Sequence, residues 1–202
     1  MRGLERVLLA TLCALLFPLP AYPGAQVYEP LADSVRSALA SALRSREAPV
    51  LQFRRSEDAY RWLFEMSRRL SKRIPDRAAR VQLLRTVHYE ATRAGLDPQL
   101  VLSVIDVESS FRKYAVSHAG ARGYMQVMPF WLSQIGRSTD NLFHMRTNLR
   151  YGCVILRHYL DIEKGDHERA LGRYNGSRGS TRYARRVENA WKQHWHYDGP
   201  TH

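Results

Sequence analysis

The stretch from Glu108 to Pro129 reads ESSFRKYAVSHAGARGYMQVMP, and the rest of the chain is interpreted around it. It begins with an acidic residue that closes an apolar helical pattern. A loop rich in Gly, Ser and Ala follows, and the stretch ends in an apolar Met-Gln-Val-Met step before a proline. We expect the other elements to hold this stretch and the residues that face it.

The acidic residue, Glu108, is predicted to project from the apolar face of its helix. Asp97-Pro98 is a typical helix start, with an acid at the N-cap and proline in the first turn. Glu108 lies four residues after Val104 and seven after Val101, so it shares their face. Burial penalises the charged form of a carboxyl group and raises its pKa, which suits a general acid.

Periodicity alone leaves a second interpretation of Glu108 open, in which it is a buried acid paired with an arginine or a backbone donor for structure. Asp106 lies two residues earlier and is expected to be a surface charge, because it points to another side of the helix. The sequence therefore gives one candidate catalytic carboxyl group here, with a structural role as the alternative.

The loop after this helix is predicted to approach a ligand closely, because Gly120, Gly123 and several alanines leave little side chain in the way. Ser117 offers a hydroxyl group in the same loop. Gln126 lies between apolar residues, so its amide needs a partner. A sugar hydroxyl or acetamido group would serve, and so would a carbonyl group of the loop itself.

Further helical patterns fill the rest of the chain, and no strand pattern is convincing. Apolar residues recur at helical spacing over 31–44, 57–73, 77–94, 148–163 and 167–174, and again through Tyr183, Val187 and Trp191. The expected apolar residues of 57–73 are Tyr60, Leu63, Phe64 and Leu70. The chain is therefore predicted to be all-α.

Tyr174 and Asn175 lie where one of these helical patterns stops at a turn. A tyrosine at a helix end can point its hydroxyl group into a cleft. The alternative is a tyrosine packed on the core with its hydroxyl group at the surface, which is common.

The first 25 residues are predicted to be a secretory signal peptide. Arg2 and Arg6 precede an apolar run, 7–17, that is too short to span a membrane. An uncleaved anchor is the alternative, and no later stretch is apolar enough to cross a bilayer. Residues 26–80 are predicted to form a small N-terminal helical extension, 81–195 the main domain, and 196–202 a tail that is frayed from Trp195 on.

The charge balance favours an anionic partner. The 202 residues carry 31 Lys+Arg against 19 Asp+Glu, a net charge of +12. Nucleic acid, a membrane surface or an acidic cell-wall polymer would suit it, although a basic surface with no specific partner is equally open. After residue 25 the one cysteine is Cys153, which leaves no internal disulfide and suggests a buried apolar residue. The histidines near the C-terminus are not spaced as a metal site, so no metal is expected.

Several blocks together resemble the soluble lytic murein transglycosylases, whose pattern is Glu-Ser, Ala-x-Ser and Gly-Ala-x-Gly-Leu-Met-Gln-x-Met-Pro. The chain has ES at 108–109, AVS at 115–117 and GARGYMQVMP at 120–129. The later family pattern, an Asn and a Gly in a helix and then Ala-Tyr-Asn-Ala-Gly, is similar to NLRYG at 148–152 and RYNGS at 173–177. The resemblance covers residues 83 to 191. The departures are Tyr124 for Leu, Arg173 for Ala, and Gly176-Ser177 for Ala-Gly.

This resemblance implies a lysozyme-like α-helical catalytic domain, the SLT domain, that cleaves the bond between N-acetylmuramic acid and N-acetylglucosamine in peptidoglycan. Glu108 would be the sole acid/base, and the product would carry a 1,6-anhydro end formed without water. No metal, nucleotide or other cofactor is implied. The resemblance also implies roles for six other residues. Ser109 would orient Glu108. The sugars or the acetamido group would be held by Ser117, Gln126 and Tyr174, and the cleft would be shaped by Met125 and Asn175.

Two other classes stay open at this point. A goose-type lysozyme would share the fold and Glu108 but admit water. A non-catalytic basic binder of wall polymer or nucleic acid would explain the charge, but not an acid on an apolar helix face followed by the Ser/Gly/Gln loop. The predicted signal peptide argues against nucleic acid. It favours a periplasmic or cell-envelope location, with peptidoglycan glycan strands as the partner and no stable transmembrane span.

Overall fold

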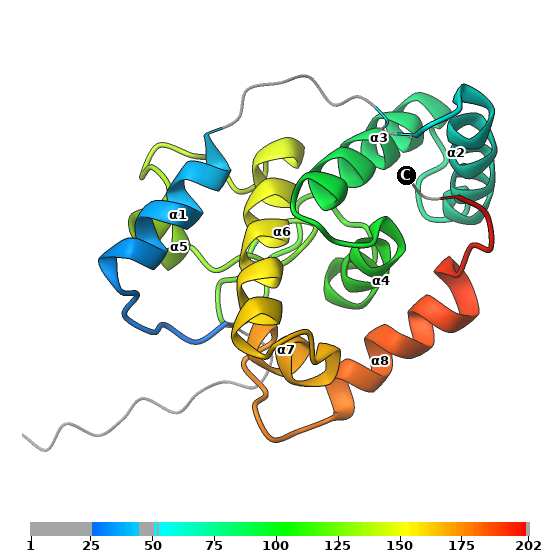
Figure 1. Ribbon diagram of the computed structural model, residues 1–202. Coiled ribbons are helices and arrows are strands. Elements are labelled where there is room, and N and C mark those ends of the chain that lie inside the picture. Colours follow the sequence, from blue (N-terminus) through cyan, green and yellow to red (C-terminus); the bar gives the residue numbers. More distant parts are fainter. Residues whose placement is uncertain (1–25, 45–50, 52, 201–202) are drawn as a thin grey trace, which may run out of the picture.

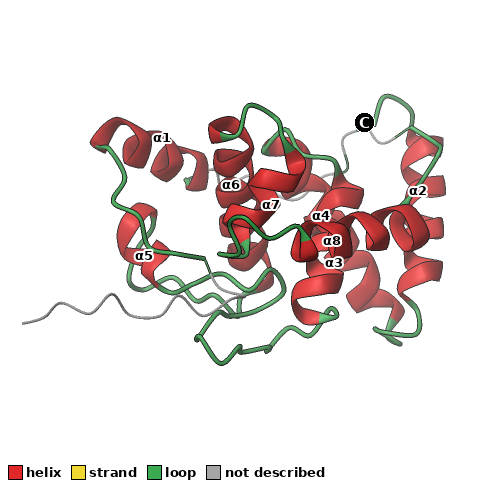
Figure 2. Ribbon diagram, turned by 90° about the horizontal axis from the view of Figure 1, so that it is seen from below, coloured by secondary structure: helices red, strands yellow, loops and turns green. Residues whose placement is uncertain are grey.

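The computed structural model describes residues 26–44, 51 and 53–200, so the predicted signal peptide, 1–25, lies outside the described residues. The elements in order are α1 (Asp33–Leu43), α2 (Ser56–Leu70), α3 (Arg77–Arg93), α4 (Pro98–Ser109), α5 (Phe130–Ile135), α6 (Met145–Ile162), α7 (His167–Tyr174), α8 (Arg182–Ala190) and a π-helical segment, η1 (Trp191–Trp195). Extended pairing in the described part of the chain is limited to isolated bridges within the loop after α4. The predicted all-α class is confirmed (Figure 2).

Helix α4 lies among the other helices and is almost wholly buried (Figure 1). Asp97 caps its start by accepting two backbone N–H groups of the first turn, at 2.6 and 3.4 Å, and Pro98 opens the helix as expected. Its end is set by two consecutive residues with left-handed backbone, Ser110 at φ 50° and Phe111 at φ 62°. Because α4 contacts α3, α8 and η1, its last turn is held from several sides.

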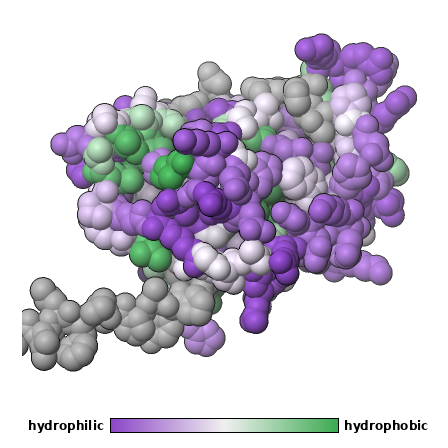
Figure 3. All heavy atoms as spheres, turned by 60° about the horizontal axis from the view of Figure 1, so that its bottom comes forward, coloured by the Kyte–Doolittle hydropathy of each residue, from purple (hydrophilic) through white to green (hydrophobic). Residues whose placement is uncertain are grey.

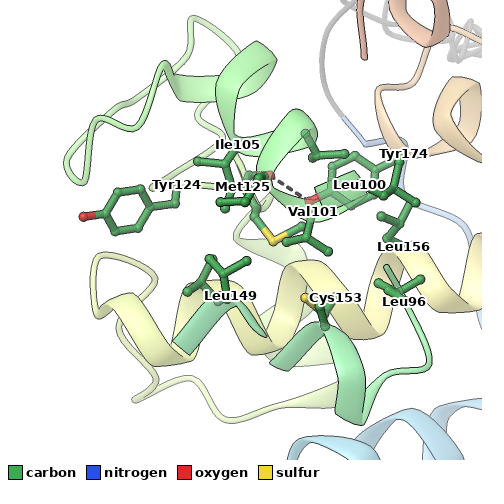
Figure 4. Packing of buried hydrophobic residues seen from close by; sticks show 14 of the residues in the cluster. Leu96, Leu100, Val101, Ile105, Tyr124, Met125, Leu149, Cys153, Leu156 and Tyr174 are labelled. Carbon is green, nitrogen blue, oxygen red and sulfur yellow. Dashed lines mark hydrogen bonds between the residues drawn. The ribbon is translucent and has the colours of Figure 1, made fainter. Parts of the chain in front are cut away.

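Helix α6 packs directly against the loop that follows α4. A Cβ atom added at Gly152 would lie 2.4 Å from the sulfur of Met125, so a larger residue would push the loop away. Figure 4 shows the Met125 side chain near Val101 of α4 and Leu149 of α6. The glycine in α6 therefore allows the loop to join the core formed by these two helices.

The apolar face of α2 differs from the predicted one. Trp62, Met66 and Leu70 are fully buried in the core, whereas Tyr60 and Phe64 are 70% and 72% exposed. Of the apolar residues from which this helix was predicted, Leu70 is therefore buried, whereas Tyr60 and Phe64 lie on its outer face. Both faces carry apolar residues at four-residue spacing, and the face with the tryptophan is the one packed against the rest of the domain.

Helices α1 and α2 of the predicted N-terminal extension pack on different sides of the molecule (Figure 1). α1 contacts α5 and α6, whereas α2 contacts α3 and η1. No residue of α1 is fully buried, and its apolar side chains, such as Leu39 and Leu43, are partly buried against the core. The predicted boundary between an extension, 26–80, and a main domain, 81–195, stays a prediction.

The C-terminal end of the helical region corrects two expectations. Trp195 was expected to belong to a frayed tail, yet it is 1% exposed and its Nε1 donates to Asp106 Oδ2 at 3.0 Å. Asp106 was expected to be a surface charge, yet it is 9% exposed and also pairs with Arg73 at 2.8 Å. Both predictions were wrong because η1 folds back onto α4 and buries the side of that helix that carries Asp106.

The surface turned toward the viewer in Figure 3 is mostly hydrophilic, with apolar atoms gathered on the side where α1 and α5 lie. Among the described residues, no helix combines the length and the apolar character needed to cross a bilayer.

Candidate active site

Glu108 lies in the last turn of α4, and α8 brings a tyrosine against it. Tyr183 Oη donates a hydrogen bond to Glu108 Oε1 at 2.6 Å, although 75 residues separate the two in sequence. Tyr183 is 5% exposed, whereas the Glu108 side chain remains partly exposed. The carboxyl group is therefore oriented by a buried partner while a reacting molecule can still reach it.

Burial raises the pKa of Glu108 from its ordinary value of 4.5 to about 7. The hydrogen bonds from Tyr183 and Asn175 and the positive charge of Arg186 favour the carboxylate and act in the opposite direction, but burial outweighs them. Burial also raises the pKa of Tyr183 well above 10, so that its hydroxyl group stays a donor. A carboxyl group with a pKa near neutrality can both give and take a proton at the same pH.

Ser109, predicted to orient Glu108, holds the following loop instead. Its hydroxyl group donates to the carbonyl oxygen of Tyr124 at 2.7 Å and lies 3.1 Å from that of Ile105, and the side chain is 1% exposed. Its bonds tie the end of α4 to the loop fifteen residues later. Ser109 therefore positions the loop relative to Glu108, and its partners are main-chain groups rather than the carboxylate.

Gln126 uses its amide nitrogen within the loop. Nε2 donates to the carbonyl oxygens of Gly123 at 2.9 Å and Ala115 at 3.2 Å, and the residue is 5% exposed. Its backbone is in the left-handed region, at φ 47°, which is unfavourable for a residue with a side chain. The sequence left open whether the amide binds a sugar or a carbonyl group of the loop, and in the structure its nitrogen binds carbonyl groups of the loop. Ser117 is partly exposed, and its Oγ accepts the N–H of Ala121 at 3.1 Å.

Met125 and Tyr174 form the inner side of this loop. Both side chains are fully buried, and Tyr174 Oη donates to the carbonyl oxygen of Met125 at 2.8 Å, the dashed line in Figure 4. The two sequence-based alternatives had the Tyr174 hydroxyl group in a cleft or at the surface, whereas in the structure it is buried against the loop main chain. It fixes the loop main chain, and Asn175 at the end of α7 is left beside Glu108.

Asn148, which belongs to the family-like blocks, holds the outer end of the same loop. Its side chain accepts the N–H of Met125 at 2.8 Å and donates to the carbonyl oxygens of Arg122 at 2.8 Å and Leu142 at 2.9 Å. Gly123 lies directly over it at φ 75°, where an added Cβ would be 2.4 Å from Asn148 Nδ2. The asparagine and the glycine therefore fit together as one contact.

Sequence reasoning missed Tyr183 and Arg186 as parts of the site. Tyr183 had been assigned to the apolar face of the last helix, which is correct but incomplete. The available signal was its hydroxyl group, because a buried tyrosine hydroxyl usually finds a polar partner. Among the described residues, no group of three or more His, Cys, Asp or Glu side chains is arranged to hold a metal ion.

Comparison with known proteins decides the family. The family model of the transglycosylase SLT domain matches residues 85–196. This is more than half of the chain and includes every residue of the site described above. This chain belongs to the transglycosylase SLT domain family. The SLT domain therefore runs from within α3 to just beyond η1.

Individual relatives match over shorter parts. Membrane-bound lytic murein transglycosylase C of Actinobacillus pleuropneumoniae serotype 5b (strain L20) is 50% identical over 48 residues, 24% of this chain and 13% of the relative. A transglycosylase of Enterobacteria phage PRD1 is 30% identical over 109 residues, 54% of this chain and 40% of the relative. The matches thus span less than half the length of these relatives.

A solved structure is also similar to this SLT chain. It is an inactive mutant of the lytic transglycosylase Slt from Pseudomonas aeruginosa, with 24% sequence identity and a TM-score of 0.43. The match covers 62% of this chain and 22% of that chain.

Proposed function

We propose that this protein is a peptidoglycan lytic transglycosylase that cleaves the MurNAc–GlcNAc β-1,4 bond with Glu108 as its single acid/base. The observation that carries the proposal is the Glu108 carboxyl group, oriented by Tyr183 at 2.6 Å and raised in pKa to about 7 by burial. Membership of the SLT family supports it, as does the similarity to a membrane-bound lytic murein transglycosylase C and to a phage transglycosylase.

The proposed reaction has two proton transfers and one new bond. Glu108 donates its proton to the glycosidic oxygen while the bond from that oxygen to the muramyl C1 breaks. The muramyl 6-hydroxyl oxygen then bonds to C1, and its proton passes to the Glu108 carboxylate. Atoms balance without water, and Glu108 ends in the protonation state in which it began.

This route needs only one carboxyl group from the protein. A hydrolase with two carboxylates needs its second one within about 5–10 Å, on the other side of the sugar or beside it. Asp106, the nearest acid in sequence, is committed to Arg73 and Trp195. The side chains that lower the pKa of Glu108 are Tyr183, Asn175 and Arg186, and none of the three is a carboxylate. The acetamido group of the substrate can take the place of a protein nucleophile, because its carbonyl oxygen can bond to C1 as the glycosidic bond breaks and can leave again when the 6-hydroxyl oxygen bonds to C1.

The remaining site residues are proposed to bind the glycan. Nε2 of Gln126 is committed to the loop, so Oε1 is the atom that can accept a hydrogen bond from the sugar. Asn175 lies beside Glu108 and can contact the same sugar. Ser117 can do so along the loop, whereas Ser109, Met125 and Tyr174 would act by holding that loop in place.

The partner is proposed to be the peptidoglycan glycan strand rather than nucleic acid, in the periplasm or elsewhere in the cell envelope. The net charge of +12 suits an acidic wall polymer. The predicted signal peptide and the relatives named as membrane-bound murein enzymes support the location.

The test is a digest of purified peptidoglycan by the protein, with product ends identified by mass spectrometry. We expect 1,6-anhydromuramyl ends from the wild type, none from Glu108→Gln, and unchanged strand binding by that variant. Glu57→Gln, a change at an exposed carboxylate of α2, is the matched control and should cleave normally. Reducing muramyl ends, one water heavier, would replace the proposal with a lysozyme-type hydrolysis. Cleavage by Glu108→Gln would overturn the assigned role of Glu108.

A further inference from the structure

A short segment before α1, residues 26–30, lies against the loop that carries Gln126; we call it the strap. Gln26 is 4% exposed, and its side-chain amide binds the loop main chain twice. Nε2 donates to the carbonyl oxygen of Gln126 at 3.2 Å, and Oε1 accepts the N–H of Met128 at 2.9 Å. The Gln26 side chain also hydrogen-bonds to Tyr174. One glutamine thus contacts both the loop and the tyrosine that supports it.

The rest of the strap is anchored by charge and ring contacts. Glu29 pairs with Arg173 at 3.7 Å and with Arg178, both of them at the end of α7 or just beyond it. The carbonyl oxygen of Glu29 accepts a hydrogen bond from Gln134 Nε2 at 3.2 Å, and the ring of Tyr28 meets that of Phe130 edge to face at 5.5 Å. The blue segment that leads into α1 in Figure 1 accordingly starts beside the α6–α7 end of the molecule.

The strap lies outside the part of the chain that matches the family model, which begins at residue 85. One of its anchors, Arg173, stands where the family pattern quoted above has alanine. An alanine there could make no ion pair with Glu29. Arg173 pairs with Glu163 as well, so this departure from the family pattern links the strap to the end of α6.

The strap contacts the loop at the place where the loop backbone is least favourable. Gln126 has φ 47°, and a non-glycine residue keeps such a conformation when its surroundings fix it. The Gln126 side chain and N–H are bound from within the loop, through Gly123 and Ala115. Gln26 binds the carbonyl oxygen of Gln126 and the N–H of Met128, so the strap completes the hydrogen bonds that hold this part of the loop.

We propose that the strap is a positioning element of the active site, in which Gln26 holds the Gln126–Met128 segment in its glycan-binding shape. This inference rests on the proposed function, because the loop is taken to bind the glycan. The hydrogen bonds of Gln26 go to the loop main chain and to Tyr174 and not to Glu108, so Gln26 takes no part in proton transfer. Losing it therefore weakens glycan binding and leaves the pH dependence set by Glu108 in place.

The test compares wild type, Gln26→Ala and the control Gln82→Ala, an exposed glutamine of α3, in cleavage of soluble glycan strands. For Gln26→Ala we expect KM to rise at least fivefold and kcat to change less than threefold. The alkaline limb of the pH profile of kcat/KM should not shift. Gln82→Ala should match the wild type. An unchanged KM, or a shifted limb, would overturn the proposal.

Two further measurements keep the outcomes separate. If Gln26→Ala does not fold, Arg178→Ala loosens the strap at an exposed ion pair and should raise KM about twofold; no rise overturns the proposal. If the wild type does not cleave, the proposed function fails, and the strap is judged by hydrogen exchange of the Met128 N–H. Faster exchange in Gln26→Ala supports the positioning contact, and equal exchange overturns it.

Discussion

Two glutamates in neighbouring helices are placed in opposite environments. Glu90 of α3 is 0% exposed and pairs with Arg150 at 2.9 Å, Arg93 at 3.1 Å and Arg146 at 3.3 Å. Glu108 of α4 is partly exposed and meets a tyrosine hydroxyl group, an amide and one more distant arginine on the surface. The Glu90 carboxylate is thus surrounded by three cations, whereas the groups hydrogen-bonded to Glu108 are neutral.

The Glu90 cluster also has a structural task. Arg93 donates to the carbonyl oxygen of Ala42 at 2.5 Å, and Arg150 to that of Leu43 at 3.1 Å. These carbonyl groups belong to the last turn of α1, where unpaired acceptors and the negative end of the helix dipole favour cations. Glu90 therefore fixes two arginines that join α1 to α3 and α6, whereas Glu108 is the carboxyl group that we propose exchanges its proton.

The largest effect expected from this contrast is on stability, from Glu90→Gln. Removing the buried carboxylate leaves arginines without their counter-ion, which costs about 3 kcal/mol of unfolding free energy. Urea denaturation at pH 7 measures it. The folded Glu90→Gln protein should still cleave peptidoglycan at a rate close to that of the wild type.

The control for this prediction is Glu65→Gln. Glu65 also pairs with two arginines, Arg68 and Arg69, at 2.8 and 2.7 Å, but its side chain is 24% exposed. Its loss should cost less than about 1 kcal/mol. Equal losses for the two variants would show that burial of the Glu90 cluster does not matter.

The second effect is a pH-dependent gain in stability from Glu108→Gln. Below pH 4.5 the Glu108 carboxyl group is protonated in both the folded and unfolded states. Between pH 4.5 and about 7 it ionises in the unfolded state first, because burial raises its folded-state pKa to about 7, and the wild type loses stability. A glutamine cannot ionise, so it escapes this loss.

We expect the stability of Glu108→Gln relative to wild type to improve by about 2 kcal/mol from pH 4.5 to pH 8, less than the full pKa shift implies because the side chain is partly exposed. Urea titrations at several pH values measure it, with Glu57→Gln as a control for the loss of one surface carboxylate. A difference that stays constant with pH would contradict the raised pKa.

The smallest effect is a shift in the pH profile from Tyr183→Phe. The hydrogen bond from Tyr183 lowers the pKa of Glu108, so its removal raises that pKa further. With a bond worth about 1 kcal/mol, the alkaline limb of kcat/KM should move up by about 0.7 pH unit. Tyr60→Phe removes a hydroxyl group from an exposed ring and should leave the limb in place. A downward shift would show that the tyrosine supports the protonated form instead.

Local sequence signals predicted much of the fold, and they singled out Glu108, the residue on which the proposed site is centred. The N-cap at Asp97, the span 167–174 of α7 and the position of Glu108 on an apolar face all follow from spacing and capping rules that act within a few residues. The choice of buried face on α2 was missed, because the two candidate faces differ in their long-range packing and not in their period.

Contacts between distant segments account for what the sequence could not predict. Tyr183 meets Glu108 across 75 residues, and Trp195 meets Asp106 across 89. Gln26 reaches the loop across 100 residues. In each case a polar side chain needs a partner, and the sequence shows the need without showing which partner the packing of the helices supplies.

Glu108 should be half protonated near pH 7, because burial outweighs the two hydrogen bonds and the positive charge that favour its carboxylate. A ¹³C NMR titration of the glutamate side-chain carboxyl carbons in the full chain measures this, with the Glu108 signal assigned by its absence in Glu108→Gln. We expect a midpoint near pH 7 for this signal. A midpoint near 4.5 would mean that the carboxyl group is ionised at neutral pH, and would contradict its role as the acid.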